Sequence, residues 1–146
     1  MYSIFDIFKV GIGPSSSHTV GPMKASKMFK DELIKNKCID NVDFINIVLY
    51  GSLAFTGKGH NVDVGIILGL YGYEPDKIDN DIIDEVSKKV FLKGELQLGS
   101  HKNINFNSER DIIYDTSKKL KNNSNRMNFI AYDKNKKNIY SKVYIS

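Results

Sequence analysis

Cysteine and arginine are nearly absent from this 146-residue sequence, and tryptophan is absent altogether. The single cysteine, Cys38, excludes an internal disulfide and fits a reducing cytoplasm. Arg110 and Arg126 are the only arginines, so lysine carries almost all of the basic charge behind the net charge of +4. Proteins that read nucleic acids usually rely on arginine and gather basic residues on one face. Because the lysines here are scattered, we interpret the charge as a compositional bias and expect no nucleic-acid partner.

Long hydrophobic runs are also missing. No apolar stretch approaches the roughly 20 residues that a membrane-spanning helix needs. The N-terminus lacks the pattern of a signal peptide, because Asp6 and Lys9 interrupt its apolar residues and no small-residue cleavage site follows. The composition, 41% hydrophobic and 26% charged, is ordinary for a globular protein. We therefore expect one cytoplasmic domain with no membrane partner.

Helical patterns dominate the first two thirds of the chain. Apolar periodicity predicts helices over residues 4–8, 21–37, 62–71 and 82–90. The start of the second helix has two interpretations. Pro22 favours a start at Gly21, because proline suits the first helical position. If the helix begins earlier, at the serines, Pro22 should kink it.

Strand patterns dominate the last third. Residues 43–50 are apolar on both faces, which predicts a buried strand. Alternating or short apolar runs follow at 96–98, 104–106 and 112–114, and a mobile loop is expected at 118–125. A hairpin is predicted from 127–132 and 139–145, with a turn at 133–137. The sequence therefore predicts a single α+β domain, with helices concentrated in the first two thirds and an antiparallel sheet or hairpin in the last, rather than a parallel βαβ array.

One polar stretch, KVGIGPSSSHTVGPMKA from Lys9 to Ala25, is too tightly turned for a core element. Gly11 and Gly13 permit backbone angles that other residues avoid, whereas Pro14 fixes its own φ. The hydroxyls of this stretch both donate and accept hydrogen bonds, and His18 is of the residue type that ordinarily titrates near neutrality. A helix follows, so backbone N–H groups should converge at its N-terminus and form an anion-binding site. The alternative is an elaborate helix cap, since Ser and Thr gather before helices for structural reasons alone.

A second polar loop, GKGHN, spans residues 57–61. Its glycines let the backbone approach a ligand, Lys58 can meet a carboxylate, and His60 can carry a proton. The spacing does not match a nucleotide-binding P-loop, and a capped turn before a helix is the alternative. Because both loops carry a histidine and precede a helix, we expect the imidazoles of His18 and His60 on one face, roughly 10–12 Å apart, the span of a small ligand pocket. The third histidine, His101, is expected at the surface.

Three segments resemble one enzyme family. They are SIFDIFKVGIGPSSSHTVGPMKA from Ser3 to Ala25, YGSLAFTGKGHNVDVGIILGL from Tyr50 to Leu70, and MNFIAYDKNKKNIYSKVYIS at the end. Each is similar to the matching part of the iron–sulfur-dependent L-serine dehydratases, also called L-serine ammonia-lyases, and together they cover nearly the whole chain. The resemblance implies a lyase that converts L-serine to pyruvate and ammonia.

The resemblance also implies a division of labour. Residues 1–146 would be the beta-type domain, a fragment of a longer chain or one subunit of a two-chain enzyme. A cluster-bearing alpha domain or subunit would hold a 4Fe–4S cluster, so this segment would bind no metal and would be inactive alone. By matching positions, His18 and His60 are the catalytic candidates. The residues expected to bind substrate are Ser15, Ser16, Ser17, Thr19, Lys58 and Asn61.

Two points stay open. Family members often carry an LPxHPN-like segment before the final hairpin, whereas residues 120–125 here read LKNNSN, so the role of this segment is in doubt. Some phosphoglycerate dehydrogenases carry a related allosteric domain, so a non-catalytic serine-binding module is the alternative function. The GPSSSHT and GKGHN motifs favour the enzyme. We also expect a homo-oligomer.

Overall fold

A computed structural model of the chain describes residues 16–57, 61–117 and 125–145. Its helices are α1 (Ser16–Lys35), α2 (Ser52–Thr56), α3 (Val62–Tyr71), α4 (Asn80–Lys93) and α5 (Ser108–Asp111), with 3-10 turns η1 (Ile39–Asn41) and η2 (Pro75–Lys77). Its strands are β1 (Phe44–Gly51), β2 (Glu95–Leu98), β3 (Lys102–Asn105), β4 (Ile112–Tyr114), β5 (Asn125–Tyr132) and β6 (Asn138–Ile145). The predicted helices at 62–71 and 82–90 and the predicted hairpin are confirmed. No helix among the described residues is long and apolar enough to cross a membrane.

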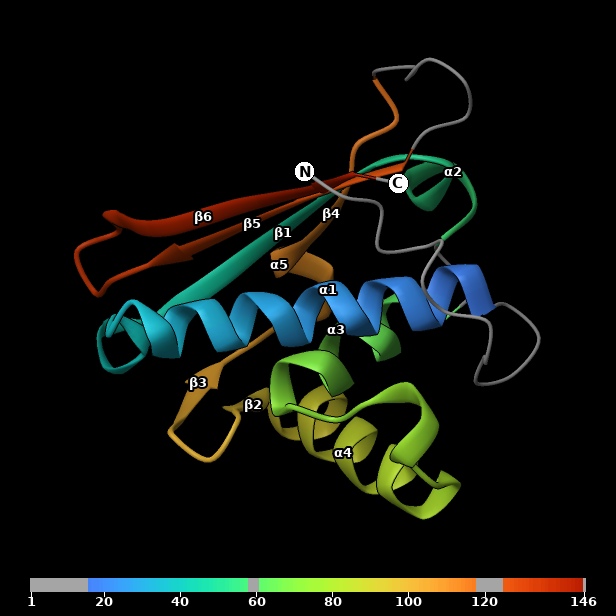
Figure 1. Cartoon of the computed structure of the whole chain (residues 1–146), viewed down its shortest axis with the longest axis horizontal. Helices are drawn as coiled ribbons and strands as arrows, with labels where there is room; N and C mark the ends of the chain where they lie inside the picture. The colour runs from blue at the N-terminus through green and yellow to red at the C-terminus, as the bar shows by residue number, and fades with distance from the viewer. Residues whose placement is uncertain (1–15, 58–60, 118–124, 146) are drawn as a thin grey trace.

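The strands form a four-stranded sheet in the order β4-β1-β5-β6 and a separate β2–β3 hairpin. β1 pairs with β5, and β5 with β6, in antiparallel register, whereas β4 lies parallel to β1. Helices α1, α3 and α4 all lie on one side of the larger sheet (Figure 1). This arrangement confirms the predicted α+β class, with one parallel strand pair added to an otherwise antiparallel sheet.

The core lies between the sheet and α1. Ile45, Ile47 and Leu49 of β1 are fully buried, and Phe29 of α1 stacks on Phe129 of β5 with ring centroids 5.1 Å apart. The residues between them on β1 are partly exposed. The prediction that β1 is buried on both faces is therefore wrong, because the helices among the described residues cover only one face of the sheet (Figure 1).

Helices α1 and α3 pack with their backbones almost in contact. A Cβ atom added at Gly65 would lie 2.6 Å from the carbonyl oxygen of Thr19, and one added at Gly69 would overlap the carbonyl oxygen of Met23. Glycine is required at both positions because any side chain would push the helices apart. Since residues 19 and 23 meet 65 and 69 in the same order, the two helices run parallel. Their N-termini therefore lie at the same end of the helical layer.

Helix α1 begins at Ser16, so the predicted start at Gly21 is wrong. Pro22 lies inside α1, where it cannot donate a hydrogen bond to the preceding turn. Burial of Val20 and Met23 in the core favours the helical path through the proline. The ribbon of α1 continues through this position as one helix (Figure 1). The structure therefore supports the interpretation in which the helix starts at the serines.

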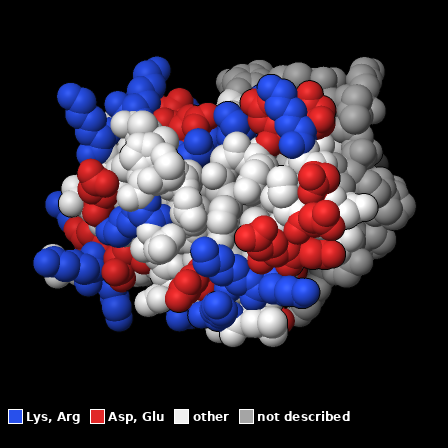
Figure 2. All heavy atoms as spheres, turned by 90° about the horizontal axis from the view of Figure 1, so that it is seen from below, with Lys and Arg blue, Asp and Glu red and all other residues white. Residues whose placement is uncertain are grey.

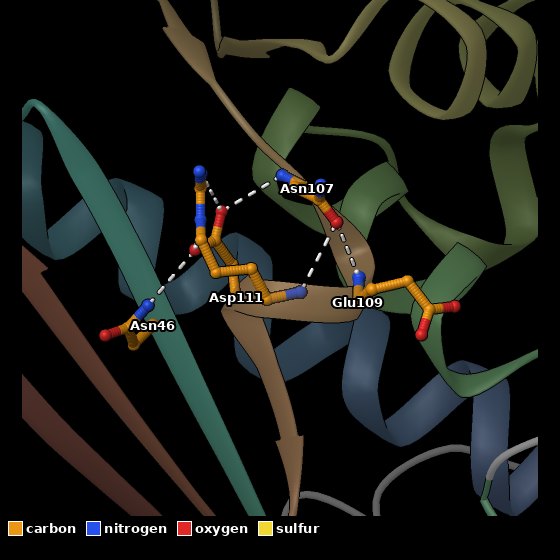
Figure 3. Close-up of polar contacts among 5 residues, drawn as sticks. Asn46, Asn107, Glu109 and Asp111 are labelled. Carbon is orange, nitrogen blue, oxygen red and sulfur yellow. Dashed lines mark hydrogen bonds and ion pairs between the residues drawn. The ribbon is translucent and has the colours of Figure 1, made fainter.

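Short helices α2 and α5 were not predicted. α5 is capped by the side chain of Asn107, which accepts hydrogen bonds from the backbone N–H groups of Glu109 and Arg110. Asp111 is 1% exposed and accepts hydrogen bonds from the guanidinium of Arg110, the backbone N–H of Asn107 and the side-chain amide of Asn46 (Figure 3). These contacts attach α5 and the start of β4 to β1.

Candidate functional site

The structure describes only part of the first motif. Ser15 lies outside the described residues, whereas Ser16, Ser17 and His18 form the first turn of α1. The side chains of these three residues also lie outside the description. Thr19 is 4% exposed and lies where α1 crosses Gly65. Thr19 therefore contributes to the packing of α1 against α3, and its role in substrate binding stays a prediction.

The structure describes the first and last residues of the second motif, Gly57 and Asn61. Lys58 and His60 lie outside the described residues. Asn61 is exposed, has a left-handed φ of 63°, and precedes α3 without capping it through its side chain. Asparagine tolerates this conformation better than most residues. Gly57 ends α2, and a Cβ atom there would overlap the carbonyl oxygen of Leu53, so this glycine serves local packing.

The two motifs converge at the backbone level. Thr19 of α1 and Gly65 of α3 are in contact. Ser16 lies about one helical turn before Thr19, and Asn61 lies about one turn before Gly65. The N-terminal ends of α1 and α3 therefore lie side by side, with both positive dipole ends directed toward the same region. This arrangement favours an anion such as a carboxylate. The expected distance of roughly 10–12 Å between the two imidazoles stays a prediction.

Asn125 is a positioning residue that the sequence analysis missed. Its side-chain oxygen accepts hydrogen bonds from the Ser52 hydroxyl, at 2.6 Å, and from the backbone N–H of Leu53, at 3.0 Å. Gly51 provides no side chain to cap α2, so Asn125 performs this task from β5. It belongs to the segment 120–125 that departs from the family pattern, and it begins β5 rather than lying in the predicted loop. No local signal in the sequence links positions 52 and 125.

Tyr114 lies at the end of β4 near the start of α3. Burial, followed by the negative charges of Asp63 and Glu109, raises the pKa of Tyr114 to about 12. Its hydroxyl therefore stays protonated at neutral pH and can donate a hydrogen bond but cannot act as a base. Asp63 is held in the first turn of α3, where its carboxylate accepts a hydrogen bond from the backbone N–H of Val64.

The described residues do not fit an iron–sulfur cluster. Such clusters are held by several cysteine thiolates, and the chain has one cysteine. The thiol of Cys38 donates a hydrogen bond to the carbonyl oxygen of Leu33, and burial raises its pKa, which disfavours the thiolate. Within the described ranges, no three His, Cys, Asp or Glu side chains gather as a metal site.

Charges of both signs are interspersed on the face seen from below (Figure 2). Helix α1 shows how they pair: Asp31 accepts hydrogen bonds from the ammonium groups of Lys27 and Lys30, at 3.2 Å and 2.6 Å. Burial alone would raise the pKa of Asp31, but these lysines outweigh it and hold the pKa below its ordinary value of 3.8. The face in view therefore lacks the basic stripe that follows a phosphate backbone.

The architecture is that of an α+β domain in which the N-terminal ends of α1 and α3 lie side by side. Comparison with known proteins identifies its class: residues 3–146 match the family "Serine dehydratase beta chain", and the chain belongs to that family. It is 44% identical over 147 residues to an L-serine dehydratase of Haemophilus influenzae and 44% over 149 residues to L-serine dehydratase 2 of Escherichia coli. An L-serine dehydratase of Streptomyces coelicolor is 38% identical over 144 residues. These matches cover 99–100% of this chain but only 32% of each relative, so the chain spans about a third of their length.

Proposed function

We propose that the chain is the beta-type domain of an iron–sulfur L-serine dehydratase, which converts L-serine to pyruvate and ammonia. The observation that supports this proposal most is the parallel packing of α1 and α3 through Gly65 and Gly69. It brings the ends of the two motif-bearing segments together, as one substrate site requires. The 4Fe–4S cluster belongs, in this proposal, to the other part of the enzyme, because the described residues here do not fit it.

The proposed role of this chain is to bind the substrate carboxylate and to move protons. The hydroxyls of the first motif, the N–H groups at the helix ends and Lys58 would hold the carboxylate. Each charge-assisted hydrogen bond contributes about 1.5–3 kcal/mol, so a few of them hold a small acid weakly. His18 and His60 are the candidates for proton transfer, which contributes about 10²–10⁴-fold to a rate.

In the overall reaction, the α-proton and the β-hydroxyl of L-serine leave as water. The resulting enamine tautomerises to an imine, and hydrolysis of the imine releases ammonia and pyruvate. The departing hydroxyl needs an electrophile, which the cluster would supply in the complete enzyme. We further propose that the complete enzyme is cytoplasmic and forms a homo-oligomer. Sedimentation of the assembled protein tests its oligomeric state.

The test is anaerobic pyruvate formation from L-serine. The chain is assayed alone and together with the part of the Haemophilus influenzae relative that it does not match, whose cluster is verified by absorbance. We expect pyruvate only from the combination. His18→Ala and His60→Ala should lower the rate by about 10²-fold or more. His101→Ala is the matched control, because His101 is exposed in the β2–β3 turn, and it should leave the rate unchanged.

Two results would contradict the proposal. Pyruvate formation by the chain alone would refute the division of labour. If the combination binds L-serine with an intact cluster but forms no pyruvate, a serine-sensing domain becomes the better explanation.

A further inference from the structure

No helix of the described part of the chain covers the second face of the four-stranded sheet (Figure 1). Side chains alternate between the faces of a strand, so the residues beside the buried Ile47, Leu49 and Phe129 point away from α1. We define the outer sheet face by six of these residues, which are register neighbours across all four strands. They are Val48, Ile113, Arg126, Asn128, Val143 and Ile145.

Aliphatic side chains on this face are open to solvent. Ile113 is 43% exposed and Ile145 is 41% exposed, and they lie on the two edge strands. Val48 lies beside Ile113 on β1, Val143 lies two residues before Ile145 on β6, and both valines are partly exposed. Two aliphatic pairs, on β4/β1 and on β6, therefore flank the polar residues of β5. Exposed apolar residues that gather on one face are typical of an interaction surface, whereas single ones are ordinary.

Polar atoms in the same patch lack partners. The guanidinium carbon of Arg126 lies 4.1 Å from the ring centroid of Tyr50, so stacking holds this side chain in place. The Nε of Arg126 and the side-chain oxygen of Asn128 are nonetheless buried without a hydrogen-bond partner. No ion pair joins Arg126 to another residue in the described part of the chain. Buried polar atoms are normally paired, so these two are exceptions. Arg126 as a whole is only partly buried, which leaves part of its side chain open to a group from another molecule.

We propose that the outer sheet face is the docking site for the further domain or subunit that the longer relatives carry, and that Arg126 binds an Asp or Glu carboxylate of that partner. This proposal rests on the proposed function, in which the enzyme consists of two parts. The relatives are about three times as long as this chain, so most of their sequence lies in that other part. A stacked arginine surrounded by aliphatic residues also matches the anatomy of interface hot spots.

A second copy of this chain fits the face less well. The outward-pointing residues of the four strands include no Asp or Glu, so face-to-face packing of two copies would place no carboxylate of a strand residue against Arg126. The size of the face suits a domain interface. Strands about 4.8 Å apart and roughly 25 Å long give about 400 Å² per side, or about 800 Å² in total, within the range of about 600–1,500 Å² for interfaces between domains.

The test is calorimetric titration, under anaerobic conditions, of the 146-residue chain with the separately produced part of the Haemophilus influenzae relative that it does not match. The wild-type chain should bind, and Arg126→Glu and Ile113→Asp should each weaken the affinity about tenfold or more. Arg126→Gln, which keeps the stacking but removes the charge, should give a smaller loss. Lys88→Glu and Leu92→Asp are the matched controls on α4, where both residues are exposed, and should stay within about twofold.

Each outcome of the titration either supports or overturns the proposed docking site. Absence of binding, or outer-face variants that bind like the wild type, would overturn the proposal. Self-association of the chain that is abolished by Ile113→Asp would assign the face to a second copy instead. Binding that depends on Arg126 without pyruvate formation would leave the docking site standing and count against the proposed function alone.

Discussion

Replacing Gly69 with alanine should destabilise the domain by separating α1 from α3. The added methyl group would overlap the carbonyl oxygen of Met23 and lie 2.6 Å from the Cβ of Ser26 and 3.0 Å from the backbone nitrogen of Lys27. Two of these three neighbours are backbone atoms and the third is a Cβ, so no side-chain rotation can relieve the overlap. The helices must move apart, and the core between them must loosen.

The magnitude follows from two opposing effects. Overpacking a tight interface costs about 1–3 kcal/mol, and more where the backbone must shift. Alanine favours a helix over glycine by about 1 kcal/mol, which offsets part of this cost. Because α3 is buried almost all round, the displacement also loosens its other contacts. We therefore expect a net loss of about 2 kcal/mol, or a fall in Tm of about 4–8 °C in a domain of this size.

Urea unfolding followed by circular dichroism measures this loss. Gly65→Ala should lose less than Gly69→Ala, because its closest contact is 2.6 Å. Gly94→Ala is the control: its φ of 68° strains an alanine by about 1 kcal/mol, but the nearest atom to the new methyl group, the Phe106 carbonyl oxygen, lies 3.5 Å away. If Gly69→Ala is as stable as the wild type, the close approach of the two helices is wrong.

Three further changes test the contacts around this end and along α1. Asn125→Ala removes two hydrogen bonds to the start of α2, at Ser52 and Leu53, and should cost about 1–3 kcal/mol in urea unfolding; an unchanged midpoint would exclude its positioning role. Asp31 has a folded-state pKa lowered because its lysine partners outweigh its burial, so its stabilisation is present above pH 3.8 and is lost as pH falls through the folded pKa. Asp31→Asn should therefore be less stable than the wild type at neutral pH, by about 0–1 kcal/mol for so exposed a pair, and should converge with it in acid; a constant difference in stability would contradict this. The combined change of Ser16 and Ser17 to alanine should weaken binding of a serine analogue to the assembled enzyme, and unchanged affinity would count against the anion-binding site.

Local patterns predicted most elements of the fold. The apolar stripe of Val62, Ile66 and Leu70 predicted α3, and Gly94 marked the end of α4 through its left-handed cap. The hairpin followed from two apolar runs around a polar turn. These signals succeed because they depend on residues a few positions apart, whose spacing matches the period of a helix or strand.

Contacts between residues far apart in the sequence could not be predicted from local patterns. Pro22 predicted a helix start by its own preference, but burial of the preceding residues, Thr19 and Val20, outweighed it. The cap of α2 comes from Asn125, 72 residues after Leu53, and no periodicity carries that information. The convergence of the two motifs depends on Gly65 and Gly69, which a single sequence shows only as weak positions in a helix.

The distance between positions 18 and 60 tests the central claim that the two motifs form one site. Cys38→Ser provides a cysteine-free chain, into which His18→Cys and His60→Cys introduce a pair of spin labels. Continuous-wave electron paramagnetic resonance of the frozen double-labelled chain should show strong dipolar broadening, as expected for groups roughly 10–12 Å apart in one small pocket. A spectrum equal to the sum of the two singly labelled chains would place the histidines too far apart and would contradict the shared site.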